Sequence, residues 1–225
     1  VGYYSEDPML TGITGTYVHR VLGRYGIVTN TKHFAFNDQE TNRDGLAVFL
    51  NEQAAREGEL RGFQIAIRDG GVKGLMSSFN RLGVTFIGAH QPLMNHILRG
   101  EWGWNGHLMT DSVKSAQYFL ARETLMAGND QMLGGSNNGN AWNFNASDLE
   151  DDPVVQNALR ESMHRKIYVY ANSVLMNGIT AESALSGFGL TWWAVVLRVL
   201  MGIGFAAFAA FGALYIAAEV KERRK

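Results

Sequence analysis

Four short runs of mainly apolar residues recur along the first part of the chain. Glycine and asparagine residues, which favour turns, lie at or near their ends. Runs of this length between turn signals are typical of buried β-strands. The candidate strands are 26–36 (GIVTNTKHFAF), 72–80 (VKGLMSSFN), 106–111 (GHLMTD) and 127–135 (AGNDQMLGG).

Longer segments with a helical period lie between and after these runs, and they predict helices at 47–67, 91–99, 113–126 and about 154–176. Pro92 stands in the first turn of the second helix and Gly100 follows its end, as is usual at helix boundaries. Strands that alternate with helices predict an α/β fold with parallel βαβ units. Four strands leave two architectures open, a small open sheet or half of a (β/α)8 barrel.

The C-terminal part of the chain has a different pattern. The stretch Val199–Ala218 contains no charged residue, and as a helix it would be about 30 Å long, the thickness of a bilayer core. Trp192 and Trp193 precede it, and the basic sequence KERRK follows at 221–225. This pattern predicts one transmembrane helix with its C-terminus in the cytoplasm. The expected parts are an extracytoplasmic region at 1–178, a linker at 179–190, a transmembrane helix at 191–220 and a cytoplasmic basic tail at 221–225. A buried core helix is the alternative.

Composition excludes several classes of function. The net charge is -1 and no basic stripe is present, so a nucleic acid is not expected as a partner. The chain has no cysteine, which excludes disulfides and thiolate metal sites. Its six histidines are scattered, so neither a metal nor a cofactor is expected.

Polar side chains gather where the candidate strands end. Lys32 and His33 lie in the first run, the polar residues of 78–80 close the second, and Asp111 closes the third. The carboxyl ends of parallel strands meet at one edge of a sheet, where ligands and chemistry gather. Taken alone, Asp111 is most simply interpreted as a turn residue. The convergence of several strand ends that carry polar residues instead favours a functional role for Asp111.

Several motifs occur in an order that closely resembles glycoside hydrolase family 3, which includes many β-glucosidases. They are YYSEDPMLTG, KHFAFNDQETNR, NEQAARE, MSSFNRLGV, LRGEWGWNGHLMTDS and AGNDQML, and together they span roughly residues 3–178. In that family this segment belongs to the C-terminal half of a (β/α)8 TIM-type barrel. The resemblance therefore favours a half barrel, followed by one transmembrane helix.

The resemblance also implies roles for particular side chains. Asp111, in the TD motif, matches the family's catalytic nucleophile. Lys32 and His33 match a pair that binds sugar hydroxyls, and Arg43 matches a position near the same site. Phe79 stands where many members have a tyrosine, so the apolar wall remains but a hydroxyl is missing.

The implied reaction is that of a retaining, exo-acting β-glycosidase that forms a covalent glycosyl-enzyme on Asp111. The family usually takes its acid/base glutamate from a second α/β domain, which has no match here, so that group is expected from outside this chain. Glu40 is interpreted as support for the site and Asp130 as a structural acceptor in a loop near the last strand. The alternatives are a catalytically silent, membrane-anchored sugar-binding protein and an N-acetylhexosaminidase, whose KHFPGHG pattern is absent.

The same resemblance predicts the partners. These are a β-linked glucoside or oligosaccharide as substrate, the lipid bilayer through 191–220, the N-terminal half of the barrel and the α/β domain. The chain is expected to be the C-terminal portion of a longer, possibly permuted enzyme and to have no useful activity alone. Half a barrel leaves strand edges open and apolar faces unburied. Asn145 begins a glycosylation sequon in the polar loop 134–147.

Overall fold

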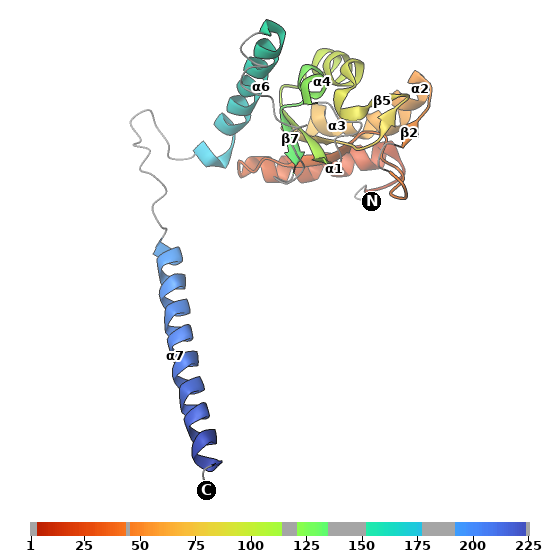
Figure 1. The fold of residues 1–225 in the computed structure, drawn as a ribbon. Coiled ribbons are helices and arrows are strands. Elements are labelled where there is room, and N and C mark those ends of the chain that lie inside the picture. The colour runs from red at the N-terminus through yellow and green to blue at the C-terminus, as the bar shows by residue number, and fades with distance from the viewer. Residues whose placement is uncertain (1–3, 44–45, 114–120, 135–151, 177–191, 224–225) are drawn as a thin grey trace. The chain divides into compact units, whose positions relative to one another are not determined.

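The structure is a computed structural model that describes residues 4–43, 46–113, 121–134, 152–176 and 192–223. The chain divides into two compact units, Val1–Gly178 and Ile179–Lys225 (Figure 1). The helices that the structure describes in the first unit are α1 (Pro8–Arg24), α2 (Glu52–Ala54), the π-helix η1 (Ala55–Glu59), α3 (Leu60–Gly70), the 3-10 helix η2 (Ile87–Ala89), the π-helix η3 (Pro92–Glu101), α4 (Ala121–Met126), α6 (Pro153–Ala171) and the 3-10 helix η5 (Val174–Met176).

The centre of the first unit is a parallel sheet whose strands follow the order β1 (Asn30–Phe34), β3 (Gly74–Ser77), β6 (His107–Val113) and β7 (Gln131–Gly134). Three of the predicted strand runs contain one of these strands, and the fourth, 106–111, covers all of β6 but its last two residues. Phe34 pairs with Ser77, and Ser77 pairs with Thr110, so the carboxyl ends of the first three strands lie at one edge. Helices separate the four strands along the chain, and the α/β class is therefore confirmed.

Helix α1 has no counterpart among the predicted helices. The Asp7 carboxylate caps it by accepting hydrogen bonds from the Met9 and Leu10 amides at 2.7 and 3.0 Å. The face that packs on α3 is built of small and polar residues, Gly12, Gly15, Thr16 and His19. A Cβ at Gly12 would lie 2.7 Å from the Ile65 Cβ, so the two helices approach closely. A buried face without large apolar residues leaves no hydrophobic period in the sequence.

The predicted helix 47–67 begins later than expected. Residues Ala47–Val48 form the short strand β2, which pairs with β4 (Arg81–Leu82), and β4 in turn pairs with β5 (Thr85–Phe86). The helical segment starts only after Asn51, whose side chain accepts a hydrogen bond from the Ala54 amide at 2.8 Å. The predicted helix 113–126 overlaps α4, whose described part starts at Ala121, but Val113 is the last residue of β6. Residues 114–120, and Asn145 with most of its loop, lie outside the described residues.

The hydrophobic core lies between the sheet and helices α3 and η3. Phe34, Leu75 and Leu108, one from each of three neighbouring strands, are fully buried. The Phe34 ring also meets Phe63 of α3 edge to face, with 5.1 Å between ring centroids. This packing fixes the strand that bears the first candidate site residues.

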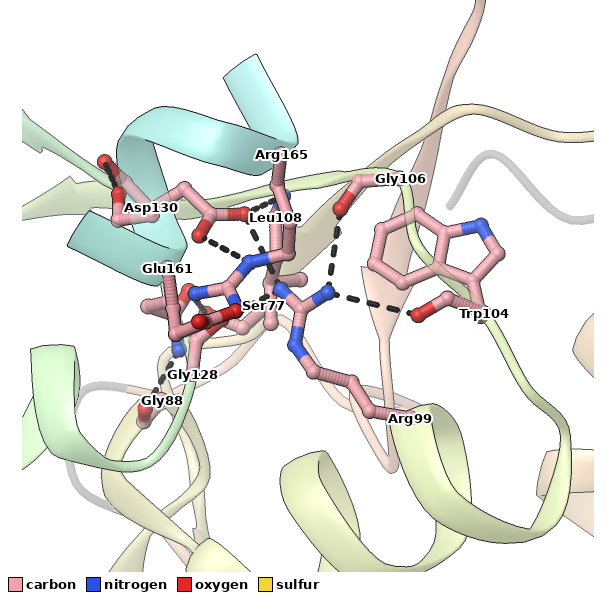
Figure 2. Close-up of polar contacts among 12 residues, drawn as sticks. Ser77, Gly88, Arg99, Trp104, Gly106, Leu108, Gly128, Asp130, Glu161 and Arg165 are labelled. Atoms are coloured by element: carbon pink, nitrogen blue, oxygen red, sulfur yellow. Dashed lines mark hydrogen bonds and ion pairs between the residues drawn. The ribbon is translucent and has the colours of Figure 1, made fainter. Parts of the chain in front are cut away.

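A buried ionic cluster joins the amino ends of β6 and β7 to two helices (Figure 2). The Asp130 side chain is fully buried and accepts hydrogen bonds from the Leu108 amide at 2.8 Å, from Arg99 Nη2 at 3.0 Å and from Arg165 Nε at 2.8 Å. Arg99 Nη1 also donates to the Gly106 carbonyl at 3.2 Å. The expected role of Asp130 as a structural acceptor is confirmed. We name these three side chains, Arg99, Asp130 and Arg165, the Asp130 cluster.

Burial in this cluster has a measurable electrostatic cost. It lowers the pKa of Arg99 to about 10, although the Asp130 carboxylate opposes the shift. The guanidinium remains charged at neutral pH, and so it depends on the single carboxylate between the two arginines.

The second unit contains helix α7 (Trp192–Glu222), whose described large apolar side chains are mostly exposed. Among the described residues, one helical stretch, Val195–Glu222, is long and apolar enough to cross a membrane. The helix expected at 191–220 overlaps α7, which runs from Trp192 to Glu222. The expected linker 179–190 lies outside the described residues.

Candidate active site

The edge of the sheet where the parallel strands end brings two of the expected site residues together. His33 is the fourth residue of β1, and Asp111 follows Thr110 in β6. The His33 Nε2 atom lies 3.1 Å from Asp111 Oδ2, and both side chains are largely buried, with 9 % and 13 % exposed. The predicted convergence of polar strand ends is thus observed for this pair.

The chain after β1 is held on the end of β3. The Ser78 hydroxyl donates to the Ala35 carbonyl at 2.7 Å, and the Asn80 side-chain amide donates to the Phe36 carbonyl at 2.8 Å. All four of these residues are buried. These hydrogen bonds fix the path of the backbone that leads from His33 to the next polar residues of the site.

Asp111 has the surroundings of an ionised carboxylate. Burial alone would raise its pKa, but the His33 imidazole, the Ser112 amide at 2.6 Å from Oδ1 and the Arg43 guanidinium at 4.0 Å from Oδ2 outweigh it. The pKa of Asp111 therefore lies below its usual value. Among the described residues no donor meets the buried Oδ2 with full hydrogen-bond geometry. The carboxylate is charged at neutral pH, and one oxygen remains available for chemistry.

Arg43 is positioned by an aromatic ring and a second carboxylate. Its guanidinium lies 4.7 Å above the centroid of the Phe79 ring, which is buried. Its Nη1 atom is 3.1 Å from Glu40 Oε2. Phe79 therefore forms an apolar seat for the cation beside Asp111, and Glu40 supports the site through Arg43 in keeping with the sequence analysis.

Asn37 is a site residue that the sequence analysis did not single out. It is buried, and its Nδ2 atom lies 3.3 Å from Glu40 Oε1 and 3.5 Å from His33 Nδ1. A lone asparagine after an apolar run is a common turn signal, so its type and position alone do not distinguish it. Its role follows only from the folded path of the loop.

The structure places Lys32 away from Asp111. This exposed side chain lines a cavity of about 550 Å³ between α1, β1 and the start of α3. Asp38 and Glu59 line the same cavity. Burial raises the pKa of Glu59 to about 7, and the neighbouring Asp38 carboxylate adds to the rise. Lys32 and His33 are adjacent in sequence but face different surroundings.

The raised pKa of Glu59 makes stability depend on pH. The folded chain keeps a proton on Glu59 up to about pH 7, whereas the unfolded chain releases it near 4.5. The free energy of unfolding should therefore fall by about 1 kcal/mol between these two pH values, after allowance for solvent screening, and then stay level. Chemical denaturation of the full chain in detergent, at a series of pH values, measures this.

A matched pair of variants isolates the group responsible. Glu59→Gln should remove most of the decrease, whereas Glu57→Gln, at an exposed neighbour, should leave it in place. A decrease of the same size in Glu59→Gln and in the unmodified chain would assign it to another group.

The described residues contain no group of three or more histidine, aspartate or glutamate side chains arranged to hold a metal ion. The chemistry that the site can support is therefore derived from its carboxylates, its imidazole and its guanidinium. A charged, buried carboxylate beside an imidazole and a cation suits nucleophilic attack on a polar, hydroxyl-rich substrate.

Comparison with solved structures places this arrangement in a known fold. A β-glucosidase 3B from Thermotoga neapolitana, solved with glucose, has a TM-score of 0.71 and 29% sequence identity over 78% of this chain. A β-glucosidase from Kluyveromyces marxianus, also solved with glucose, has a TM-score of 0.67 and 25% identity over 80% of this chain. These matches cover 25% and 22% of the respective solved chains.

Sequence relatives agree with the structural ones. A β-glucosidase of Rhizobium radiobacter is 35% identical over 133 residues, and a probable β-glucosidase K of Emericella nidulans is 33% identical over 132 residues. Each alignment covers 59% of this chain but only 16% and 15% of the relative. The model of the family described as glycosyl hydrolase family 3 N terminal domain matches residues 2–165. Because that match covers well over half of the sequence, the chain belongs to glycosyl hydrolase family 3.

Proposed function

We propose that this chain supplies the nucleophile side of the active site of a retaining, exo-acting β-glucosidase. The single observation that supports this most is the state of Asp111, a largely buried carboxylate with a lowered pKa and an available oxygen at the carboxyl ends of parallel strands. β-Glucosides are the proposed substrates, because the sequence relatives and the solved structure with a similar fold are β-glucosidases.

The proposed reaction has two steps. In the first, an Asp111 oxygen bonds to the anomeric carbon of the glucoside, the bond to the leaving oxygen breaks, and a general acid protonates that oxygen. In the second, the same group removes a proton from water, whose oxygen attacks the anomeric carbon and releases Asp111. The carboxylate must be charged at the start, which agrees with its lowered pKa.

The neighbours of Asp111 have separate tasks in this proposal. Arg43, seated on Phe79, keeps a positive charge near the carboxylate and can donate to a sugar hydroxyl. His33 orients the carboxylate from the carboxyl end of β1. Lys32 binds the sugar only if the substrate extends into the cavity that it lines with Asp38 and Glu59.

We propose that the acid/base group comes from outside this chain. Glu40 is the carboxylate linked to Asp111 through Arg43, and its contacts with Arg43 and Asn37 suit a positioning role. The chain spans about 15% of the length of the curated relatives it matches. The remaining length of such proteins has room for the other half of a (β/α)8 barrel and for a second domain. In this proposal, the four parallel strands of this chain form the half of the barrel that carries Asp111.

Helix α7 is proposed as a membrane anchor. Its length and apolar composition support one crossing of a bilayer. Arg223 and the basic residues around it favour a cytoplasmic end, which would place Asp111 outside the cytoplasm.

Covalent trapping is the direct test of the proposal. A 2-fluoro-substituted glucoside with a good leaving group should inactivate the complete enzyme, because the intermediate forms but is hydrolysed slowly. Mass spectrometry of the digested protein should then find the sugar on the peptide that contains Asp111. A label on another acidic peptide, or turnover without any covalent species, would contradict the assignment.

A further inference from the structure

Five polar side chains form a closed ring of contacts around the candidate nucleophile. Asp111 Oδ2 contacts His33 Nε2 at 3.1 Å, and Arg43 Nη1 approaches the same oxygen at 4.0 Å. The remaining contacts are His33 Nδ1 to Asn37 Nδ2 at 3.5 Å, Asn37 Nδ2 to Glu40 Oε1 at 3.3 Å and Glu40 Oε2 to Arg43 Nη1 at 3.1 Å. The role of Asn37 in this ring leads to an inference that rests on the proposed function.

Glu40 determines which way the Asn37 side chain faces. An ionised carboxylate is only an acceptor, so it must meet the NH2 group of the amide and not its oxygen. The contact from Glu40 Oε1 to Asn37 Nδ2 satisfies this requirement. Because the same Nδ2 atom also lies against His33 Nδ1, the imidazole faces a donor at that nitrogen.

A donor at Nδ1 selects one form of the histidine. Nδ1 must then present its lone pair, so the single ring proton of a neutral imidazole lies on Nε2. Nε2 is the ring nitrogen that lies 3.1 Å from Asp111 Oδ2. The opposite tautomer would set two N–H groups against each other at Asn37 and a lone pair against the carboxylate. The doubly protonated ring would satisfy Asp111 but still repel Asn37.

We infer that Asn37 is a positioning residue that holds His33 as a neutral imidazole with its proton on Nε2, the ring nitrogen nearest to Asp111. Arg43 is then the positive charge of the ring and Glu40 balances it. His33 contributes a dipole and no second charge. The Asp111 carboxylate is oriented without being neutralised by two cations, which preserves its reactivity toward an anomeric carbon.

Nuclear magnetic resonance of the imidazole nitrogens tests the inference without any catalysis. The full chain is labelled with 15N-histidine in detergent, and the His33 signals are identified by their loss in His33→Gln. Near neutral pH, Nε2 should give the shift of a protonated nitrogen and Nδ1 that of an unprotonated one. A His33 that is protonated on Nδ1, alone or together with Nε2, would overturn the inference.

Two variants that each add one negative charge distinguish the effect of the Asn37–His33 contact from a general electrostatic effect on His33. Asn37→Asp places an acceptor at Nδ1, so His33 should gain a proton there. Gln39→Glu adds its charge two residues away, on an exposed side chain that donates to the Thr41 carbonyl at 2.6 Å, and it should leave the His33 signals unchanged. Identical spectra in the two variants would contradict a specific role. If Asn37→Asp does not fold, Asn37→Ser, which removes the amide donor, should give a mixture of tautomers.

Kinetics of the complete enzyme provide an independent readout. Asn37→Asp should lower kcat/KM for an aryl β-glucoside by at least about tenfold, because a His33 that gains a proton places a second positive charge beside the Asp111 carboxylate and weakens it as a nucleophile. Gln39→Glu should remain close to the unmodified enzyme. If trapping finds no sugar on Asp111 but the nitrogen signals are as expected, the proposed function fails and the tautomer assignment stands.

Discussion

Replacement of Asp111 by asparagine should reduce the hydrolysis of an aryl β-glucoside by the complete enzyme by about 10³-fold or more. The amide has nearly the same shape, but it lacks the negative charge and cannot form the glycosyl ester. The Ser112 amide can still donate to the side-chain oxygen, so the local fold should persist. Steady-state kinetics with a chromogenic glucoside measure kcat and KM for both proteins.

A control and a rescue experiment distinguish lost chemistry from lost structure. Asp69→Asn makes the same change at a carboxylate that pairs with Arg68 on the surface, and it should leave turnover unchanged. Asp111→Gly leaves room for a small anion, so added azide should attack the anomeric carbon and give a glucosyl azide of the opposite anomeric configuration. Turnover by Asp111→Asn near the level of the unmodified enzyme would exclude Asp111 as the nucleophile.

The second large effect concerns stability. Asp130→Asn should lower the free energy of unfolding by about 3–5 kcal/mol, because it removes the negative charge between two buried arginines. Arg99 and Arg165 have 11 % and 14 % of their side chains exposed, so water screens their repulsion poorly. Chemical denaturation of the full chain in detergent, followed by tryptophan fluorescence, gives the midpoint and the free energy.

A second variant, Arg165→Met, shows how the loss of stability depends on the charge balance within the Asp130 cluster. Arg165→Met leaves one cation with one carboxylate, so it should cost less than Asp130→Asn, which leaves two cations with only the exposed Glu161 carboxylate, 3.9 Å from Arg165 Nη1, near them. Asp69→Asn should leave the midpoint unchanged. A loss below about 1 kcal/mol in Asp130→Asn would mean that the cluster contributes little beyond its packing.

The elements that the sequence predicted well are those with apolar side chains at their centres. Phe34, Leu75 and Leu108 are fully buried in the strands that their runs predicted. The polar residues toward the ends of those runs predicted the meeting of His33 and Asp111, because parallel strands must end at a common edge. In this part of the chain, local pattern and tertiary packing agree.

Features that depend on close backbone contact could not be predicted in the same way. Helix α1 packs through Gly12 and other small residues, which produce no hydrophobic period. The orientation of Lys32 depends on its tertiary surroundings, since it lines a cavity while His33 contacts Asp111. Asn37 lies in the site because Ser78 and Asn80 donate hydrogen bonds to the backbone that precedes it.

The two ends of strand β6 have different roles, one in stability and one in the candidate site. Near the amino end, the Leu108 amide donates a hydrogen bond to Asp130, and Asp111 lies in the candidate site three positions later. Side chains that decide reactivity are thus separated from those that decide whether the chain folds. Residues of the candidate site at the Asp111 edge can therefore change, by mutation or by natural divergence, without loss of the hydrogen bonds at the amino end of the strand.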